Sequence, residues 1–322
     1  MSAFASDSFD AEAYSSKRPA YPRALYDYID GCTRSPSSAS PRTCVDLGCG
    51  PGLSTFPFLE YFDKVIGIEP GQGMVKLARD LLSRRPEADQ ARMRFQVGTA
   101  EDLSGIVKED HSVDLVVACT SAHWFKDPLA VYREISRILK PSGSFFFFTY
   151  STLHFPNHPE FERLLPDFND GILGPYWSEP GHKLSETLLA QYPLPFPSNF
   201  SKSENEAQAI TGRFDSTSFE RSFFLCDSTT PLPSLRLQDE EKQVKINRFD
   251  NDSSRMIRRQ WNLGQVEDLL NTWSGSHSWN RDHPGRDCAK EFGDKLREAG
   301  WEDGREYEVV WEVGCLFGKT RK

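Results

Sequence analysis

The 322-residue chain has no apolar run long enough to cross a membrane. Its longest apolar stretch, "SFFFFTY" at 144–150, has the length of a strand, whereas a membrane span needs about 20 apolar residues. The first 20 residues lack the apolar segment of a secretory signal. We therefore expect a cytoplasmic protein that makes no membrane contact.

Paired cysteines and an excess of basic charge are also missing. The seven cysteines are an odd number and form no CxxC pair, which argues against a disulfide framework and a zinc site, so we expect no metal. Lys and Arg total 38 against 47 Asp and Glu, for a net charge of −9, so no nucleic-acid partner is indicated. Apolar residues make up 38% of the chain and include 23 Phe, which suffices for a packed core.

Short apolar runs alternate with helical patterns between residues 43 and 150. The runs predict strands at 43–47, 64–69, 93–97, 113–119 and 144–150. The intervening and flanking patterns predict helices at 22–29, 53–61, 73–83 and 127–140. This order indicates the α/β class with a doubly wound, mostly parallel sheet. With further strands at 242–249 and 306–318, we expect seven strands.

The alternation ends after residue 150. Residues 151–241 are rich in proline and aromatic residues and predict a cap insertion over the rim of the sheet. Residues 1–42 predict an N-terminal lid segment and helix, ahead of the core at 43–150. Residues 242–322 would complete the sheet, with helical periodicity at 254–276, inside a further cap segment at 253–283, and again at 286–300.

Three glycines follow the first predicted strand at alternate positions, in the stretch "VDLGCGPGLS" at 45–54. In an open α/β sheet, ligands bind beyond the carboxyl ends of the strands. Gly48, Gly50 and Gly52 would let a ligand touch the main chain there, because glycine has no Cβ. Glu69 ends the second predicted strand, where a carboxylate can accept both hydroxyls of a ribose.

Later turns at the same edge complete a site for a nucleoside. Met74 begins the next helix and is placed to lie on a flat base. The turn "GTAED" at 98–102 offers backbone and acidic groups to an adenine edge, and "CTSAHWF" at 119–125 lines the same crevice. The ordered set predicts an adenosine-containing ligand.

These motifs resemble those of class I S-adenosylmethionine-dependent methyltransferases. The likeness runs from "VDLGCGPG" through "GIEP", "GTAEDL" and "DLVVACTSAHWF" to "REISRILKPSGSFFFF", over 43–150. In addition, "AYSSKRPAYP" at 13–22 resembles the entry segment of the trans-aconitate methyltransferase-like group. "LGPYWSEPG" and "LNTWSGSHSW" resemble cap segments of its fungal members.

The resemblance implies that S-adenosyl-L-methionine is the cofactor. It implies these cofactor-binding residues: Tyr14, Arg18, Gly48, Gly50, Gly52, Glu69, Met74, Ala100, Glu101, Cys119 and Thr120. One departure concerns Thr99, because many members of the family have an acid at that position. Glu101 or Asp102 would then take its place.

The acceptor side has several candidates, each with a structural alternative. His123 is the candidate catalytic residue, positioning the acceptor or taking its proton, unless it only caps its loop. Trp124, Trp177, Trp273 and Trp279 would wall an apolar or planar acceptor, unless they pack as cap core. A basic cluster on the helix predicted at 254–276, Arg255, Arg258 and Arg259, is either a solvated face or a grip on an acidic substrate.

The predicted function is the transfer of a methyl group to a small-molecule carboxylate, hydroxyl or thiol by in-line displacement, in secondary metabolism. A general base is needed only when the acceptor arrives protonated. The alternative is a non-methylating member of the fold, either a cofactor-binding regulatory protein or an enzyme of another reaction type. A nicotinamide oxidoreductase would share the sheet, but the GxGxG turn disfavours it. We expect a monomer or weak dimer.

Overall fold

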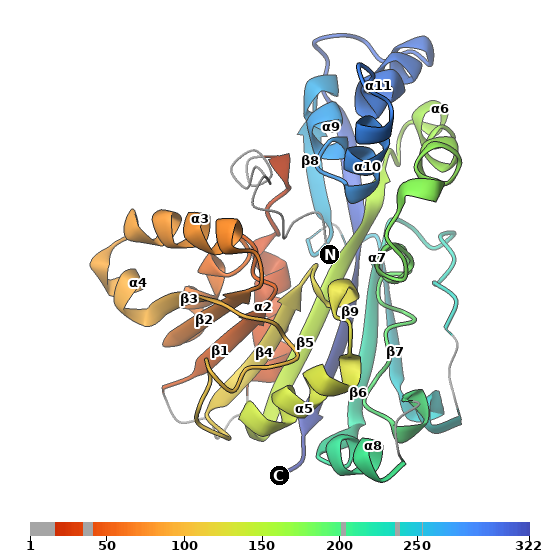
Figure 1. Cartoon of the computed structure of the whole chain (residues 1–322). Coiled ribbons are helices and arrows are strands. Elements are labelled where there is room, and N and C mark those ends of the chain that lie inside the picture. Colours follow the sequence, from red (N-terminus) through yellow and green to blue (C-terminus); the bar gives the residue numbers. More distant parts are fainter. Residues whose placement is uncertain (1–16, 35–40, 201–203, 236–238, 253) are drawn as a thin grey trace.

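The computed structural model describes residues 17–34, 41–200, 204–235, 239–252 and 254–322, and a mixed sheet runs through this part of the chain (Figure 1). The strand order is β3-β2-β1-β4-β5-β9-β6-β7, with β8 paired to β9. The strands are β1 (Thr43–Leu47), β2 (Lys64–Glu69), β3 (Met93–Val97), β4 (Val113–Cys119), β5 (Leu139–His154), β6 (Phe214–Leu225), β7 (Lys245–Asp250), β8 (Ile257–Trp261) and β9 (Tyr307–Thr320).

The sheet has a parallel half and a largely antiparallel half. Strands β1 to β5 pair in parallel, so their carboxyl ends meet at one edge. Strand β9 runs antiparallel to β5, β6 and β8, and β7 is parallel to β6. The predicted α/β class is confirmed. The described chain forms nine strands rather than seven, because β6 and β8 also join the sheet.

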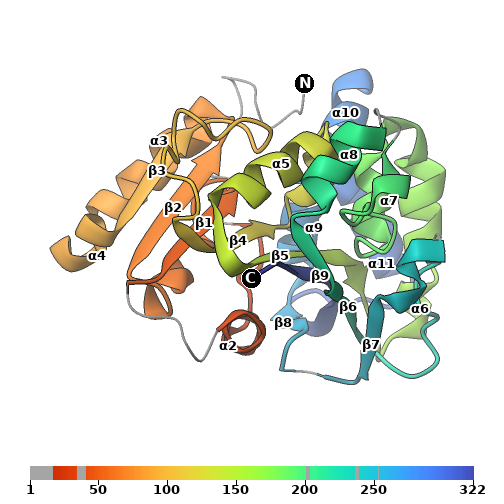
Figure 2. The ribbon, with the colours of Figure 1, turned by 90° about the horizontal axis from the view of Figure 1, so that it is seen from below.

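Helices cover both faces of the sheet (Figure 2). Helices α2 and α3 contribute to the apolar cluster on one face, and α5 and α8 to the cluster on the other. The helices are α2 (Arg23–Thr33), α3 (Gln72–Ser83), α4 (Glu87–Arg92), α5 (Pro128–Ile138), α6 (Pro159–Glu162), α7 (Gly181–Glu186), α8 (Glu204–Thr211), α9 (Leu263–Leu270), α10 (Ser274–Asp282) and α11 (Cys288–Glu298).

The four consecutive phenylalanines of β5 show why the central strands of this sheet are rich in apolar residues. Phe146 and Phe148 pack into the cluster beneath α2 and α3, and Phe145 and Phe147 into the cluster beneath α5. All four are at most 1% exposed. Successive side chains of a strand point to opposite faces, so most positions of a strand that is covered on both sides are apolar.

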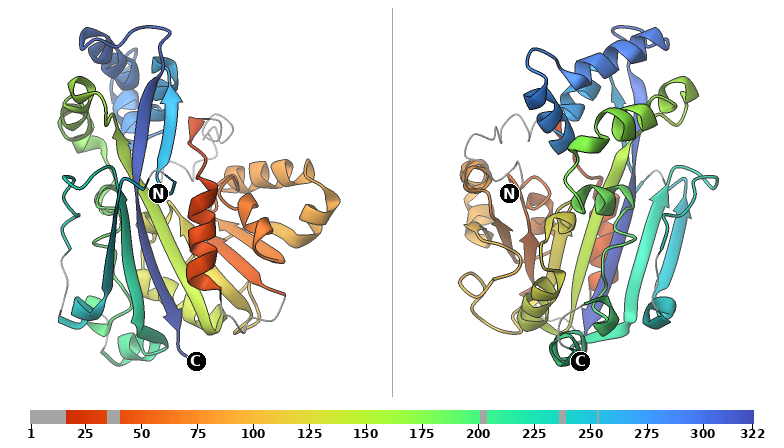
Figure 3. Two further views of the ribbon diagram at one scale, coloured as in Figure 1. Left: turned by 180° about the vertical axis from the view of Figure 1, so that it is seen from behind. Right: turned by 45° about the vertical axis from the view of Figure 1, so that its right-hand side comes forward.

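A helical cap stands beyond the carboxyl-end edge, where α6, α9, α10 and α11 lie together (Figures 1 and 3). Their buried residues continue one apolar cluster of the sheet. Strand β5 is longer than the predicted 144–150 and reaches into this cap together with β8 and β9. The cap therefore packs on an extension of the sheet itself.

The prediction of a helix at 254–276 is wrong for the first third of this segment. Residues 257–261 form β8, which pairs with β9 from Ile257↔Trp311 to Trp261↔Tyr307. The apolar ends of this segment are buried against the neighbouring strand, and the ring centroids of Trp261 and Trp311 are 5.0 Å apart. The periodicity continues only after Asn262, which closes a capping box with Gln265 and begins α9.

The early part of the chain agrees with the sequence more closely. The strands predicted at 43–47, 64–69, 93–97 and 113–119 are confirmed with the same bounds. The helix predicted at 53–61 is instead a series of turns followed by a 3-10 helix, η2 (Phe56–Glu60), because Pro57 has no N–H to donate. The segment 151–241 also contains β6, so part of it belongs to the sheet rather than to a cap.

Gly318 on β9 offers a test of this packing. A Cβ at this position would lie 2.6 Å from ring atoms of both Phe145 and Phe219. Gly318→Ala should lower the free energy of unfolding by about 1–3 kcal/mol, measured by urea denaturation. Gly105→Ala is the control, because a Cβ there meets nothing within 4 Å. Equal stability of the two variants would contradict the packing described.

Candidate functional site

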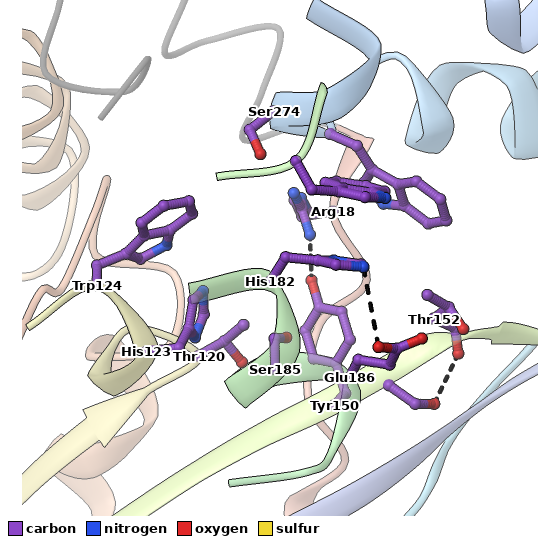
Figure 4. Close-up of a pocket in the computed structure, with 13 residues that line it drawn as sticks. Arg18, Thr120, His123, Trp124, Tyr150, Thr152, His182, Ser185, Glu186 and Ser274 are labelled. Carbon is purple, nitrogen blue, oxygen red and sulfur yellow. Dashed lines mark hydrogen bonds and ion pairs between the residues drawn. The ribbon is translucent and has the colours of Figure 1, made fainter. Parts of the chain in front are cut away.

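Two adjoining pockets open at the carboxyl-end edge of the sheet. The glycine pocket is lined by residues 18–21, 48–51, 53, 54, 119, 120 and 150. The indole pocket is lined by residues 18, 120, 123, 124, 150–152, 177, 182, 185, 186, 273 and 274 (Figure 4). Arg18, Thr120 and Tyr150 line both, and we call these three residues the junction. A ligand in one pocket would therefore meet a ligand in the other.

The three glycines of the first turn differ in what a side chain at each position would meet. All three have positive φ angles, which favour glycine. A Cβ on Gly48 would lie 2.6 Å from Cβ of Ser121, and one on Gly52 would lie 2.6 Å from the ring of Phe95. A Cβ on Gly50 would meet no protein atom within 4 Å. Only Gly48 and Gly50 line the glycine pocket, so Gly52 serves internal packing.

The carboxylate of Glu69 holds this turn. Its Oε2 accepts the backbone N–H of Gly50 at 3.1 Å, and its Oε1 accepts that of Gly71 at 2.9 Å. Burial raises the pKa of Glu69 above its usual value, although both backbone hydrogen bonds oppose the shift. Each oxygen keeps one lone pair, so the carboxylate can accept further hydroxyl donors.

The residues predicted around an adenine are not brought into either pocket. Met74 on α3 and Ala100 are buried, and the carboxylate of Glu101 accepts the backbone N–H of Lys126 at 2.9 Å. None of the three lines the glycine pocket or the indole pocket. Glu69 does not line them either and is connected to the glycine pocket through Gly50, so the roles of all four residues stay predictions. Tyr14 lies outside the described residues. Cys119 is buried and lines the glycine pocket, as predicted from its place at the end of β4.

The junction is tied to the N-terminal segment by hydrogen bonds. Nη1 of Arg18 donates to the hydroxyl of Tyr150 at 2.7 Å, and the hydroxyl of Tyr21 bonds Oγ1 of Thr120 at 2.8 Å. Thr120 has a φ of 51°, which is rare for a β-branched residue and is typical of strained functional sites. Sequence reasoning missed Tyr150 and Tyr21. The signal for Tyr150 was a polar-tipped aromatic at the end of an apolar strand.

Three of the four tryptophans predicted on the acceptor side line the indole pocket. Trp124, Trp177 and Trp273 line it, and the ring centroids of Trp177 and Trp273 are 5.7 Å apart. Trp279 does not reach the pocket. Its ring stacks on His283 at 4.0 Å and packs inside the cap, so the structure supports the cap-core alternative for this residue.

Two histidines face the indole pocket in different surroundings. His123 lies on the 3-10 helix η3 (Ala122–Trp124), and its Nδ1 is buried without a hydrogen-bond partner among the described residues. Burial and the nearby charge of Arg18 lower the pKa of His123 to about 3. His182 on α7, which the sequence did not reveal, stacks on Trp177 with centroids 4.1 Å apart. Burial also lowers the pKa of His182.

The basic cluster near residue 257 makes structural contacts instead of lining a pocket. Arg255 pairs with Asp252 and lies over the ring of Tyr28, 5.0 Å from its centroid. Nη1 of Arg258 donates to Glu308 at 3.0 Å, and Nη2 of Arg259 donates to the carbonyl of Ala20 at 2.6 Å. None of the three arginines lines the glycine or the indole pocket.

Two kinds of feature are absent from the part of the chain that the structure describes. It contains no group of three or more His, Cys, Asp or Glu side chains placed to hold a metal ion. It also contains no helix with the length and apolar character that a membrane crossing requires.

Comparison with known proteins places these features in context. Residues 45–147 match the family model described as a methyltransferase domain. The chain is 26% identical over 302 residues to the probable S-adenosylmethionine-dependent methyltransferase CRG1 of Saccharomyces cerevisiae, covering 90% of this chain and 88% of that protein. It is 33% identical over 103 residues to the trans-aconitate 2-methyltransferase of Azoarcus sp., covering 31% of this chain and 35% of that one.

The fold as a whole is shared with a solved structure. A putative type II methyltransferase from Anaeromyxobacter dehalogenans superposes with a TM-score of 0.62 at 22% identity, over 94% of this chain and 97% of that one. At this level of identity the similarity concerns the fold alone. It extends through the cap as well as the parallel half of the sheet.

Asp46 on β1 provides a test of the electrostatics beneath the glycine pocket. It is fully buried, its Oδ2 accepts the hydroxyl of Thr55 at 2.7 Å, and burial raises its pKa from 3.8 to about 7. At a pH between these two values, Asp46 is ionised in the unfolded chain but protonated in the folded chain. The free energy of unfolding therefore falls as the pH rises from about 4 to about 7. Asp46→Asn removes this dependence of stability on pH, because asparagine does not titrate.

The difference in unfolding free energy between Asp46→Asn and the parent protein should therefore grow in favour of the variant by about 3–4 kcal/mol from pH 4 to pH 8. Urea denaturation at both pH values measures it, and the contributions of all other groups cancel in the comparison. A difference that does not change with pH would show that Asp46 titrates as an ordinary carboxylate.

Proposed function

The chain is a class I S-adenosylmethionine-dependent methyltransferase, and we propose that it methylates a small molecule held in the indole pocket. The observation that carries this proposal is that Arg18, Thr120 and Tyr150 line both pockets. A cofactor in the glycine pocket and an acceptor in the indole pocket would meet at this junction. Holding two reactants in contact and in line is the main contribution that a protein makes to methyl transfer.

The residues around the glycine pocket fit the cofactor. The carboxylate of Glu69 has lone pairs for the two ribose hydroxyls. The backbone at Gly50 is open toward the pocket, since a Cβ there meets no protein atom. Cys119 and Thr120 line the pocket and Thr120 belongs to the junction, so we place the amino acid end of the cofactor beside these two residues. Arg18 would neutralise its carboxylate there.

The cofactor, when bound, supplies a methyl group on a positively charged sulfur. The chain aligns the acceptor and keeps water away from it. Trp124, Trp177 and Trp273 provide apolar walls. His123 is neutral, because burial and Arg18 lower its pKa to about 3, and this favours a role as a hydrogen-bond partner that positions the acceptor over one as a proton acceptor.

We extend the proposal to the setting of the enzyme on the basis of its resemblance to the fungal trans-aconitate methyltransferase-like group. The enzyme would act in secondary metabolism in the cytoplasm, as a monomer or weak dimer. The sequence leaves open whether the acceptor is a carboxylate, a hydroxyl or a thiol. A substrate screen distinguishes these three classes.

The screen incubates the protein with S-adenosyl-L-methionine and a set of small acids, phenols and thiols. Mass spectrometry should find one acceptor that gains the mass of a methylene group, with an equal amount of S-adenosylhomocysteine formed. Tight binding of the cofactor without turnover of any acceptor would instead support the non-methylating alternative.

Glu69 should be essential for cofactor binding. Replacing it with alanine removes two charge-assisted hydrogen bonds to the ribose, which corresponds to about 3 kcal/mol, or roughly a hundredfold in affinity. Calorimetry with S-adenosyl-L-methionine measures the loss, and Glu298→Ala on the exposed face of α11 is the control. Unchanged affinity in a folded Glu69→Ala variant would rule out the ribose contact.

Gly50→Val should abolish binding, because its side chain would occupy the space that the cofactor needs. Backbone strain is a competing cause, since Gly50 has a φ of +54°. Gly304→Val separates the two effects: Gly304 has a φ of +81°, and its Cβ also meets nothing within 4 Å, but it does not line the glycine pocket. Both variants should melt earlier, and only Gly50→Val should lose the cofactor. Equal binding by both would contradict the proposal.

A further inference from the structure

We propose that the acceptor is a hydroxyl group on a flat, largely apolar molecule, and that His182, with Glu186 beside it, accepts the hydroxyl proton. This inference rests on the proposed function and assigns the chemistry of the same pocket. It is carried by the composition of the pocket walls, the way His182 is held and the charges around the two histidines.

The walls of the indole pocket suit a flat molecule of low charge. Three indoles line it, and Arg18 is the one Lys or Arg among its lining residues within the described ranges. The guanidinium of Arg18 already donates to the hydroxyl of Tyr150 and to the carbonyl of Thr272. A tricarboxylate would bring three negative charges to this single cation, and burying unpaired charge is unfavourable.

His182 is held in one orientation. Its ring stacks on the indole of Trp177 with an interplanar angle of 3°, and Nε1 of Trp177 is itself anchored to the carbonyl of Asn169 at 2.9 Å. At the start of α7, a Cβ on Gly181 would lie only 3.0 Å from the carbonyl of His123. The close approach of α7 to η3 therefore brings His182 against the same pocket as His123 (Figure 4).

Glu186 lies one helical turn beyond His182 and completes a pair. Nε2 of His182 is 4.0 Å from Oε2 of Glu186, a distance at which a protonated imidazole is stabilised by a carboxylate. With Nε2 on the side of Glu186, the other ring nitrogen of His182 is the one left to accept a proton. The side chain of Glu186 is 45% exposed, so a proton received by the pair can leave to water.

The charges around the two histidines differ in sign. Arg18 opposes the protonated form of His123, whose pKa falls to about 3. The groups that act on His182 are acidic: Glu179 before α7 and Asp170 on η4 (Asp167–Ile172) both oppose the effect of burial. His182 is thus neutral at rest, and its cation is stabilised once it forms. Of the two histidines, His182 has the surroundings of a base.

A base in this position selects among the three possible acceptor groups. A carboxylate is already ionised at neutral pH, and a thiol with a pKa of about 8.5 is partly ionised, whereas a phenolic hydroxyl with a pKa of about 10 keeps its proton. A hydroxyl acceptor therefore gains most from a neighbouring imidazole. The presence of His182 favours this class.

The balanced step transfers one methyl group and one proton. A lone pair of the acceptor oxygen forms a bond to the methyl carbon while the carbon–sulfur bond of the sulfonium breaks, and that electron pair stays on sulfur. The hydroxyl proton passes to the imidazole of His182, which becomes a cation beside Glu186. The products are a methyl ether, S-adenosylhomocysteine and a proton that is released to water.

Three probes of one shape test the inference: a naphthol, the naphthalenethiol and the naphthoic acid of the same substitution. The parent protein should methylate the naphthol fastest. His182→Phe keeps a flat ring against Trp177 but has no nitrogen, and it should lower kcat for the naphthol by about a hundredfold or more. The affinity for S-adenosyl-L-methionine should not change. Glu186→Gln should cause a smaller loss, about tenfold, and Glu298→Gln on α11 should cause none.

The dependence of kcat on pH distinguishes a proton-accepting role of His182 from a purely structural one. The kcat of the parent protein should fall at acidic pH as His182 becomes protonated, with a midpoint below the usual pKa of histidine because burial lowers it. Asp170 and Glu179 act on His182. The same two groups and Lys183 act on Glu186, and His182 itself opposes the protonation of His123. Arg18 is the further charge at the pocket wall. In His182→Phe, the remaining kcat should no longer fall at acidic pH.

Two results would overturn the inference while the proposed function stands. One is faster methylation of the naphthoic acid or the naphthalenethiol than of the naphthol. The other is equal turnover of the naphthol by His182→Phe and the parent protein. Cofactor binding without methylation of any of the three probes or of the small acids in the screen would overturn both proposals.

Discussion

Strand β5 and its antiparallel pairing with β9 hold the two pockets in one geometry. The pairing runs from Ser144↔Lys319 to His154↔Val310, with a register shift between Tyr150 and Leu153. The parallel pairing of β5 with β4 ends at Cys119↔Phe148. Beyond that point β5 leaves the parallel half of the sheet and continues into the cap. Tyr150 lies just past the point of departure and therefore stands between the glycine pocket and the indole pocket.

The cap is attached through the same ladder. Strand β8 pairs with the part of β9 that lies inside the cap, and α9, α10 and α11 pack on this extension through one apolar cluster. Because β5 and β9 pair on both sides of the register shift, in the core and in the cap, the indole pocket cannot shift far without breaking backbone hydrogen bonds. The N-terminal segment closes the arrangement, since Arg18 bonds Tyr150 on β5 and the carbonyl of Thr272 after α9.

The sequence was most informative where periodicity is strong. Between residues 43 and 119 the apolar runs predicted four strands with their observed bounds, and Glu69 and the glycine turn lie where the order of elements placed them. A strand buried on both faces has a nearly continuous apolar run, and this signal can be recognised without knowledge of the neighbouring strands.

The remaining features depend on tertiary contacts that no local pattern contains. Strand β8 was read as part of a helix, because Ile257 and Trp261 are four residues apart and match a helical face as well as two buried strand positions. His182 lies in a segment without periodicity, and its importance comes from its stack on Trp177. For Trp279 the sequence left both a pocket wall and cap core open, and α10 directs the ring to His283 inside the cap.

The central claim is that a cofactor in the glycine pocket and an acceptor in the indole pocket meet at the junction of Arg18, Thr120 and Tyr150. A crystal structure of the complex with S-adenosylhomocysteine tests it most directly. The account predicts ribose hydroxyls bound to the carboxylate of Glu69, the ligand backbone against Gly50, and a sulfur atom that faces the indole pocket past Tyr150. A ligand bound elsewhere, or a sulfur separated from the indole pocket by protein, would contradict it.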